Sequence, residues 1–239
     1  MRVTTYAQLM ELLDGLWAAG ADRTSRDAAP FWDGLLQQDD HPLHSDLPDA
    51  GLLAWRDAGL LGGNGSGRRA LDVGCGLGRN SRWLAAQGFA VTGIDIAPYA
   101  VQEAARRSSG LETTYREVDF VREPVPGGPF DLVYDSGCFH HLAPHRRISY
   151  MESLRECLSP QGLFGICTFT AGRMGTTASD EELLLQRGLE GGVAYSLDEL
   201  REMFAWLEVV DARLMPPPHE HADATFSHDF LQVALFRKR

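Results

Sequence analysis

The 239-residue chain has little positive charge and no long hydrophobic run. Its 22 lysine and arginine residues are outnumbered by 33 acidic residues, which gives a formal net charge of −11. A basic patch is the usual footprint of a protein that binds nucleic acid or an anionic membrane, so we expect neither partner. No apolar run approaches the ~18 residues of a membrane span, and no basic-then-apolar signal pattern opens the chain.

Cysteine is scarce as well. The four cysteines form no C-x-x-C pair, and three of them fall in predicted strands or helices, as buried thiols of a reducing compartment usually do. They are Cys75, Cys138, Cys157 and Cys167. These absences together predict a cytoplasmic protein.

What is present suits one large α/β domain with an added N-terminal segment. Hydrophobic residues make up 44% and charged residues 23% of the chain, as in ordinary globular proteins. We place an N-terminal helical cap and substrate cover at residues 1–67 and the main domain at residues 68–239, joined by the sequence GGNGSGRR. In the first segment, Thr5 can cap a helix whose apolar residues share one face, and Gly20 is expected to end it. Those apolar residues are Leu9, Leu12, Leu13, Leu16 and Trp17.

Residues 68–170 alternate between strand and helix, which is typical of a doubly wound parallel sheet. The predicted strands are Ala70–Val73, Val91–Ile94, Thr113–Val118, Phe130–Tyr134 and Leu163–Phe169. A helix over His145–Leu158 is expected to end at the sequence SPQG. Beyond residue 170, the S-x-x-E capping box of Ser196 opens a helix through Phe204, and strands are predicted at Leu207–Leu214 and Phe230–Arg237.

The segment Leu71–Asp95 carries the strongest functional signal. It predicts a strand, a glycine turn, a helix and a second strand that ends at an acid. Glycines let the backbone turn sharply and approach a ligand closely, and an acid at the end of the second strand of such a unit can bind two ribose hydroxyls. The chain is therefore expected to bind an adenosine-type cofactor.

The spacing of the glycines distinguishes between cofactors. The dinucleotide fingerprint G-x-G-x-x-G/A needs a small residue where this chain has Arg79, and Asp72 stands two residues before the first glycine. A carboxylate beside the turn suits a ligand with a cationic ammonium and sulfonium better than it suits a diphosphate. A nicotinamide-dependent oxidoreductase is disfavoured for this reason.

At these residues the chain resembles the class I S-adenosylmethionine-dependent methyltransferases. The sequence GCGLGRNSRWLAAQGFAV is similar to the small-molecule group that includes thiopurine and tellurite-resistance methyltransferases. The resemblance implies an α/β fold with a doubly wound, mostly parallel seven-stranded sheet whose last strand is antiparallel. It also implies S-adenosyl-L-methionine as cofactor and S-adenosyl-L-homocysteine as product.

The resemblance assigns the cofactor site residue by residue. The glycines would enclose the methionine end with Asp72 near its ammonium group, Asp95 would bind the ribose, and Ile96 would pack on the adenine. Asp119 would accept a hydrogen bond from the adenine amino group beside Phe120, and the residues after the fourth strand would line the transferring methyl group. The full set is Asp72, Gly74, Cys75, Gly76, Gly78, Asn80, Asp95, Ile96, Asp119, Phe120, Asp135 and Ser136.

His140 and His141 are the candidate catalytic residues. They follow a central strand at its carboxyl end, where open α/β sheets bind ligands. A hydroxyl acceptor needs a base, and histidine suits neutral pH. Adjacent residues point in different directions, so at most one should face the substrate, and either could instead cap a helix or satisfy a buried carbonyl.

Other polar clusters have plainer interpretations. His219, Glu220, His221 and His228 follow no established zinc spacing, so we expect a substrate rim and no metal. Arginines 146, 147 and 187 could bind a substrate carboxylate or be solvated charges. A closed aromatic pocket could be formed by Phe31, Trp32, Trp55, Met174 and Tyr195, although two of the first three are expected to dock the N-terminal helices instead.

The sequence therefore predicts a methyltransferase that acts on an O, N or S atom of a small molecule, as a monomer or homodimer. The alternative is a protein of the same fold that binds S-adenosylmethionine and catalyses a non-methylating reaction, such as a natural-product cyclisation. No residue pattern identifies the acceptor.

Overall fold

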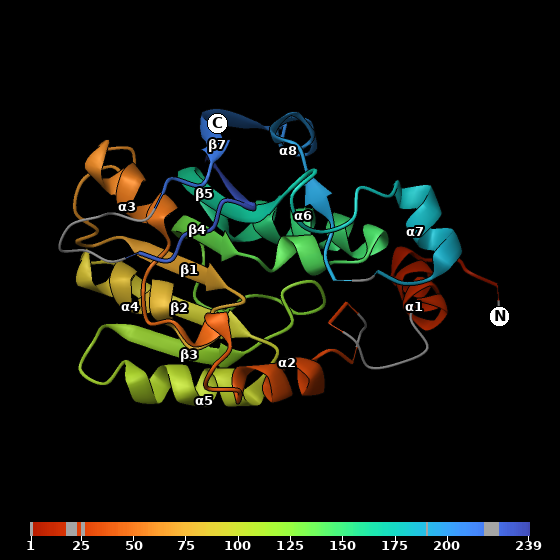
Figure 1. The fold of residues 1–239 in the computed structure, drawn as a ribbon, viewed down its shortest axis with the longest axis horizontal. Coiled ribbons are helices and arrows are strands. Elements are labelled where there is room, and N and C mark those ends of the chain that lie inside the picture. Colours follow the sequence, from red (N-terminus) through yellow and green to blue (C-terminus); the bar gives the residue numbers. More distant parts are fainter. Residues whose placement is uncertain (1, 18–22, 25–26, 190, 218–224) are drawn as a thin grey trace.

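The central element of the computed structural model is a sheet with helices on both faces (Figure 1). The structure describes the chain except residues 1, 18–22, 25–26, 190 and 218–224. The strand order is β3-β2-β1-β4-β5-β8-β7, and a short β6 pairs with β5. The strands are β1 (Arg69–Val73), β2 (Ala90–Asp95), β3 (Thr113–Glu117), β4 (Phe130–Ser136), β5 (Leu158–Thr170), β6 (Ala194–Tyr195), β7 (Leu207–Leu214) and β8 (Leu231–Lys238).

The predicted topology is confirmed. Strands β1 to β5 pair in parallel, and β8 lies antiparallel between β5 and β7. The last strand is therefore the antiparallel one, as expected. The predicted helix ends at Cys157, before the sequence SPQG, which itself belongs to β5: that strand begins at Leu158 and shifts register against β4 between Phe130 and Leu132.

Alternating side chains of the strands divide the core into two layers. In β1 and β4, Leu71, Val73 and Val133 belong to one apolar cluster, whereas Ala70 and Leu132 belong to the other. Residues one apart in a strand point to opposite faces, so both faces of the sheet are covered. The helices are α1 (Tyr6–Leu16), α2 (Ala29–Leu36), α3 (Ala50–Asp57), α4 (Arg79–Ala86), α5 (Pro98–Arg107), α6 (Pro144–Cys157), α7 (Asp180–Gln186) and α8 (Leu197–Met203).

The predicted helix caps are present. The Thr5 side chain accepts a hydrogen bond from the Gln8 backbone N–H at the start of α1. Ser196 and Glu199 form the expected capping box before α8, which ends at Met203 with Phe204 as its cap. These contacts satisfy backbone donors that have no partner within the helix.

The predicted apolar stripe of α1 is buried only at one end: Trp17, the cap of the helix, is 5% exposed and belongs to the core, and Leu13 is half-buried. Leu9, Leu12 and Leu16 are 40%, 42% and 47% exposed, whereas the buried residues of the helix are Met10 and Asp14. The helix ends at Leu16, and Gly20 lies outside the described residues. Charge pairing of Asp14, described below, helps to determine which face of this helix points inward.

No helix in the described part of the chain is both long enough and apolar enough to cross a membrane.

Candidate active site

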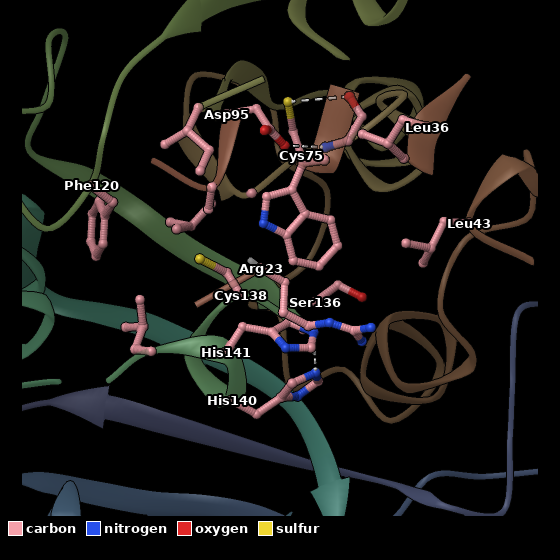
Figure 2. A pocket seen from close by; sticks show the side chains of 18 of the residues that line it. Arg23, Leu36, Leu43, Cys75, Asp95, Phe120, Ser136, Cys138, His140 and His141 are labelled. Carbon is pink, nitrogen blue, oxygen red and sulfur yellow. Dashed lines mark hydrogen bonds between the residues drawn. The ribbon is translucent and has the colours of Figure 1, made fainter. Parts of the chain in front are cut away.

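A cavity of about 750 Å³ lies at the carboxyl ends of β1 to β4. The strand order reverses direction between β1 and β4, and open α/β sheets bind ligands in the crevice at such a switch point. The opposite wall comes from the N-terminal segment, with α2 and the residues up to Leu43. Figure 2 shows side chains from both walls pointing into the same space.

The glycine turn after β1 forms one end of the cavity. Gly74 and Gly76 line it with φ angles of +64° and +52°, which side-chain-bearing residues rarely adopt. A Cβ on Gly74 would lie 3.0 Å from the Cβ of Cys138. Cys75 and Asn80 also line the cavity, but Gly78 does not: it precedes α4 and packs against Tyr115.

Asp95 is held rigidly beside this turn. Its carboxylate accepts hydrogen bonds from the backbone N–H groups of Gly76 and Ala97, both at 2.9 Å. Burial raises the pKa of Asp95, and these two N–H groups oppose that shift. The carboxylate is thereby oriented before any ligand arrives, as binding of ribose hydroxyls requires.

Asp72 lies deeper, at the floor of the cavity. It is 1% exposed and accepts a hydrogen bond from the Ser81 hydroxyl at 2.6 Å. Burial, and to a lesser degree the nearby charge of Asp49, raises the pKa of Asp72 to about 7. A cationic ligand group would favour its charged form.

Ile96, Asp119 and Phe120 line the other end of the cofactor side, where adenine is expected. Asp119 accepts a hydrogen bond from the Val121 N–H at 3.0 Å and pairs with Arg122. An apolar wall next to a fixed carboxylate suits a purine with an exocyclic amino group.

The two residues predicted after β4 have different surroundings. Ser136 lines the cavity, but the Asp135 side chain does not. Asp135 is fully buried and accepts hydrogen bonds from the Tyr150 hydroxyl at 2.7 Å and the Cys138 N–H at 2.8 Å. In this structure it holds the turn after β4 in place.

His140 and His141 lie together on the acceptor side of the cavity (Figure 2). Their Nε2 atoms are 3.1 Å apart, and the Nδ1 atom of His141 lies 2.9 Å from the carbonyl oxygen of Gly191. His140 stacks on Phe169 at 3.8 Å between ring centres. Burial lowers the pKa of His140 well below the ordinary value and that of His141 to about 4, so both rings are neutral at physiological pH.

Only some of the residues expected to form the aromatic pocket line the cavity. Trp32 lines the cavity and packs edge-on against His141 at 5.1 Å, and Met174 lines it as well. Trp55 is fully buried against Tyr134 and donates a hydrogen bond to Asp211 at 2.8 Å, so it docks α3 on the sheet. Phe31 and Tyr195 do not line the cavity.

Of the second cluster, His219, Glu220, His221 and His228, the structure describes only His228. His219, Glu220 and His221 lie outside the described residues. His228 lines the cavity and stacks on Phe230 at 4.8 Å. Among the described residues, no group of three or more His, Cys, Asp or Glu side chains is arranged to hold a metal ion.

A family model described as "Methyltransferase domain" matches residues 70–162 of the chain. An uncharacterized methyltransferase of Schizosaccharomyces pombe is 37% identical over 97 residues, which are 39% of this chain and 67% of the relative. The chain belongs to the methyltransferase family. It depends on S-adenosylmethionine, in agreement with the glycine turn, Asp95 and the cavity.

Further relatives support the fold of this methyltransferase. A ubiquinone biosynthesis O-methyltransferase of Marinobacter nauticus is 41% identical over 108 residues, 43% of this chain and 44% of the relative. The N-methyltransferase NodS of Bradyrhizobium japonicum, solved with S-adenosylhomocysteine, superposes with a TM-score of 0.63 at 18% identity. That match covers 88% of this chain and 97% of NodS.

The methyltransferase also places residues in its cavity that the sequence did not single out for binding. Arg79 donates a hydrogen bond to Ser136 at 3.0 Å and pairs with the fully buried Asp49 at 2.8 Å. Arg23, from the segment before α2, lines the acceptor side. The fold of the N-terminal segment positions both Asp49 and Arg23, and no sequence motif marks them.

Proposed function

We propose that the protein transfers a methyl group from S-adenosylmethionine to a nucleophilic O, N or S atom of a small molecule. The observation that carries this proposal is the continuity of one cavity from Asp95 and the glycine turn to the two histidines. A volume of about 750 Å³ accommodates a cofactor and a small organic acceptor together. Relatives named for O- and N-methylation support such an acceptor.

The described residues fit the cofactor. Asp95 offers a preoriented carboxylate to the ribose, Asp72 a buried acid to the ammonium group, and Ile96 an apolar surface to the adenine. When bound, S-adenosylmethionine supplies a methyl group on an activated sulfonium. Because that leaving group needs no further activation, the protein's main tasks are to position the acceptor and to exclude water.

The histidine pair supplies a neutral base. The Gly191 carbonyl accepts only, so His141 donates from Nδ1 and its Nε2 accepts a hydrogen bond from His140 Nε2. This arrangement leaves a lone pair on His140 Nδ1, a buried atom that has no described partner and that the acceptor has to reach. We infer that the pair receives the proton of an oxygen or nitrogen acceptor, whereas a thiol, which ionises readily, needs it less.

The thiopurine and tellurite-resistance group remains our proposal for the subgroup. TehB of Haemophilus influenzae superposes with a TM-score of 0.57 at 18% identity over 78% of this chain and 62% of that chain, a likeness of fold. A further similar structure comes from work on the conversion of a disulfide bond into a thioacetal group during echinomycin biosynthesis. It superposes with a TM-score of 0.62 at 24% identity over 88% of this chain and 92% of that chain.

The proposed methyl transfer is tested by following a labelled methyl group from the cofactor to the product. The protein is incubated with methyl-¹³C S-adenosylmethionine and a metabolite extract, and products are analysed by mass spectrometry. We expect equimolar S-adenosylhomocysteine and a labelled product, both lost in Asp95→Ala and reduced about 100-fold in His140→Asn for an oxygen acceptor. An acceptor that is transformed while the cofactor keeps its label would replace this proposal with a non-methylating reaction, such as a cyclisation.

A further inference from the structure

Four arginines line the cavity, and they differ in whether a carboxylate pairs with them. Three of the four have a carboxylate partner. The pairs are Arg79 with Asp49, Arg122 with Asp14 and Asp119, and Arg146 with Asp14. In the part of the chain that the structure describes, Arg23 has no such partner, and its guanidinium lies over the Phe31 ring at 5.0 Å.

The acids that line the cavity are on the cofactor side. They lie near the ends of β1, β2 and β3 or in the loop after β3: Asp72, Asp95, Glu117, Asp119 and Glu123. The acceptor side, as far as the described residues show, holds aromatic rings and imidazoles instead. A half-buried guanidinium in such surroundings attracts an anionic ligand group strongly, because few charges compensate it.

Arg23 lies close enough to three histidines to influence each of them. Its charge contributes to lowering the pKa of His41, His140 and His141, after the larger effect of burial. Figure 2 shows the Arg23 side chain next to His141, whose ring contacts His140. Arg23, which has no carboxylate partner among the described residues, therefore lies beside the predicted base.

We propose that the methyl acceptor carries a carboxylate, which binds to Arg23 while its apolar part packs against Trp32, which lines the cavity. This inference rests on the proposed function and adds the class of the acceptor, a small aromatic or otherwise apolar acid. Guanidinium groups bind carboxylates through two parallel hydrogen bonds, which fixes the orientation of the acceptor. The three arginines already paired with acids are not available for this role.

The bound acid would also act on the base. A carboxylate on Arg23 offsets the positive charge that lowers the pKa of the neighbouring histidines. The pKa of the histidine pair then rises when the acceptor is in place, so that a proton from the acceptor is taken up more readily. A neutral acceptor would not produce this change.

Two molecules could bring a carboxylate to Arg23, the acceptor and the methionine part of the cofactor. The position of Arg23 among the histidines favours the acceptor, and binding experiments separate the two. By calorimetry, S-adenosylhomocysteine is compared with methylthioadenosine, which has no carboxylate. The protein saturated with S-adenosylhomocysteine is then titrated with 4-hydroxybenzoate and indole-3-acetate, each against its carboxamide.

The variant is Arg23→Gln, and the matched control is Arg187→Gln, which removes an exposed arginine that does not line the cavity. We expect at least one acid to bind 10- to 100-fold more tightly than its amide. Arg23→Gln should abolish this preference and Arg187→Gln should keep it. Methylthioadenosine binding, unchanged in both variants, reports that the fold is intact.

Several outcomes would overturn the proposal. These are equal binding of acid and amide, a preference that survives Arg23→Gln, or no binding of either acid. A loss in Arg23→Gln confined to S-adenosylhomocysteine would assign the carboxylate to the cofactor instead. Failure of the proposed function is a separate result: acids would bind, but no S-adenosylhomocysteine would form from labelled cofactor with any acceptor.

Discussion

Asp72 and Asp95 are buried acids at the ends of neighbouring strands, and they respond to their surroundings differently. Two backbone N–H groups hold the carboxylate of Asp95, whereas Asp72 has one hydroxyl partner and a second acid nearby. Burial raises the pKa of both acids; for Asp72, with the charge of Asp49 nearby and only the Ser81 hydroxyl opposing it by a hydrogen bond, the pKa reaches about 7. This single residue therefore changes its protonation state near neutral pH.

Cofactor affinity should depend on pH through Asp72. A cationic ammonium group favours the carboxylate, so the pKa of Asp72 falls on binding and a proton is released. Affinity for S-adenosylmethionine should then weaken as pH falls below 7, by at most tenfold per pH unit for one proton. The histidine pair does not interfere, because its pKa values lie at about 4 or well below the ordinary value.

Calorimetry between pH 5.5 and 7.5 measures this dependence. Asp72→Asn is the control, and its affinity should stay constant over the range. An identical pH response in the variant would assign the proton to another buried acid, such as Asp95 or Asp135. A flat response in the wild-type protein would contradict the contact between Asp72 and the cofactor.

The glycine turn and Asp95 could be predicted from sequence because their geometry is local. A strand, a turn with positive φ angles and a second strand in register lie within 25 residues, and neighbouring parallel strands bring them together. Arg23 could not be found in this way. Its position depends on how the N-terminal segment folds back over the sheet, which no short spacing encodes.

At the scale of elements, α1 is held by a buried charge as well as by Trp17, the buried end of its apolar stripe. Asp14 accepts hydrogen bonds from His145 at 2.9 Å and from Arg122 at 3.0 Å, and it pairs with Arg146. Burial works to raise the pKa of Asp14, but these partners outweigh it and hold the pKa below its usual range. One helical carboxylate thus connects α1 to α6 and to the loop after β3.

Asp14→Asn should destabilise the protein by about 3 kcal/mol, because it leaves buried cations without a counter-charge. The free energy of unfolding in urea measures this effect. Asp198→Asn is the control: Asp198 pairs with Arg201, and their side chains are 90% and 44% exposed, so less than about 1 kcal/mol should be lost. Equal losses in the two variants would show that Asp14 acts as an ordinary surface residue.

Hydrophobic periodicity predicted the α1 helix but not its orientation. Leucines at helical spacing mark a helix, yet the buried side of α1 carries Asp14. The cations that Asp14 meets come from positions more than 100 residues further along the chain. Long-range pairing of this kind is not encoded in a local pattern.

At the scale of the whole molecule, the N-terminal segment is part of the core. Leu52, Leu53 and Trp55 of α3 are at most 1% exposed, and Trp55 belongs to the same cluster as Tyr134 and Val233 of the sheet. A Cβ on Gly165 would come within 2.8 Å of the Trp55 ring, so the helix lies directly on β5. The predicted boundary at residue 67 therefore does not separate two independent cores.

A chain truncated to residues 68–239 should fold poorly, whereas one that begins at residue 46 and keeps α3 should unfold cooperatively. Each large apolar side chain of α3 contributes about 1.5–3 kcal/mol by burial, and total stabilities are only about 5–15 kcal/mol. Thermal unfolding followed by circular dichroism measures the difference. A cooperative transition for residues 68–239 at the full-length temperature would show that the sheet is stable without α3.

The wall formed by α2 has a kinetic consequence. Asp33 of α2 accepts a hydrogen bond from the Tyr99 N–H at 2.9 Å, and Leu36 packs with Leu77 and Ala97 beside the glycine turn. We expect this wall to open once per catalytic cycle, so that spent cofactor can be exchanged. We expect this opening, and not bond formation, to limit turnover. Rapid-quench measurements should show a burst of S-adenosylhomocysteine equal to one enzyme equivalent, followed by a slower steady rate that falls as solvent viscosity rises.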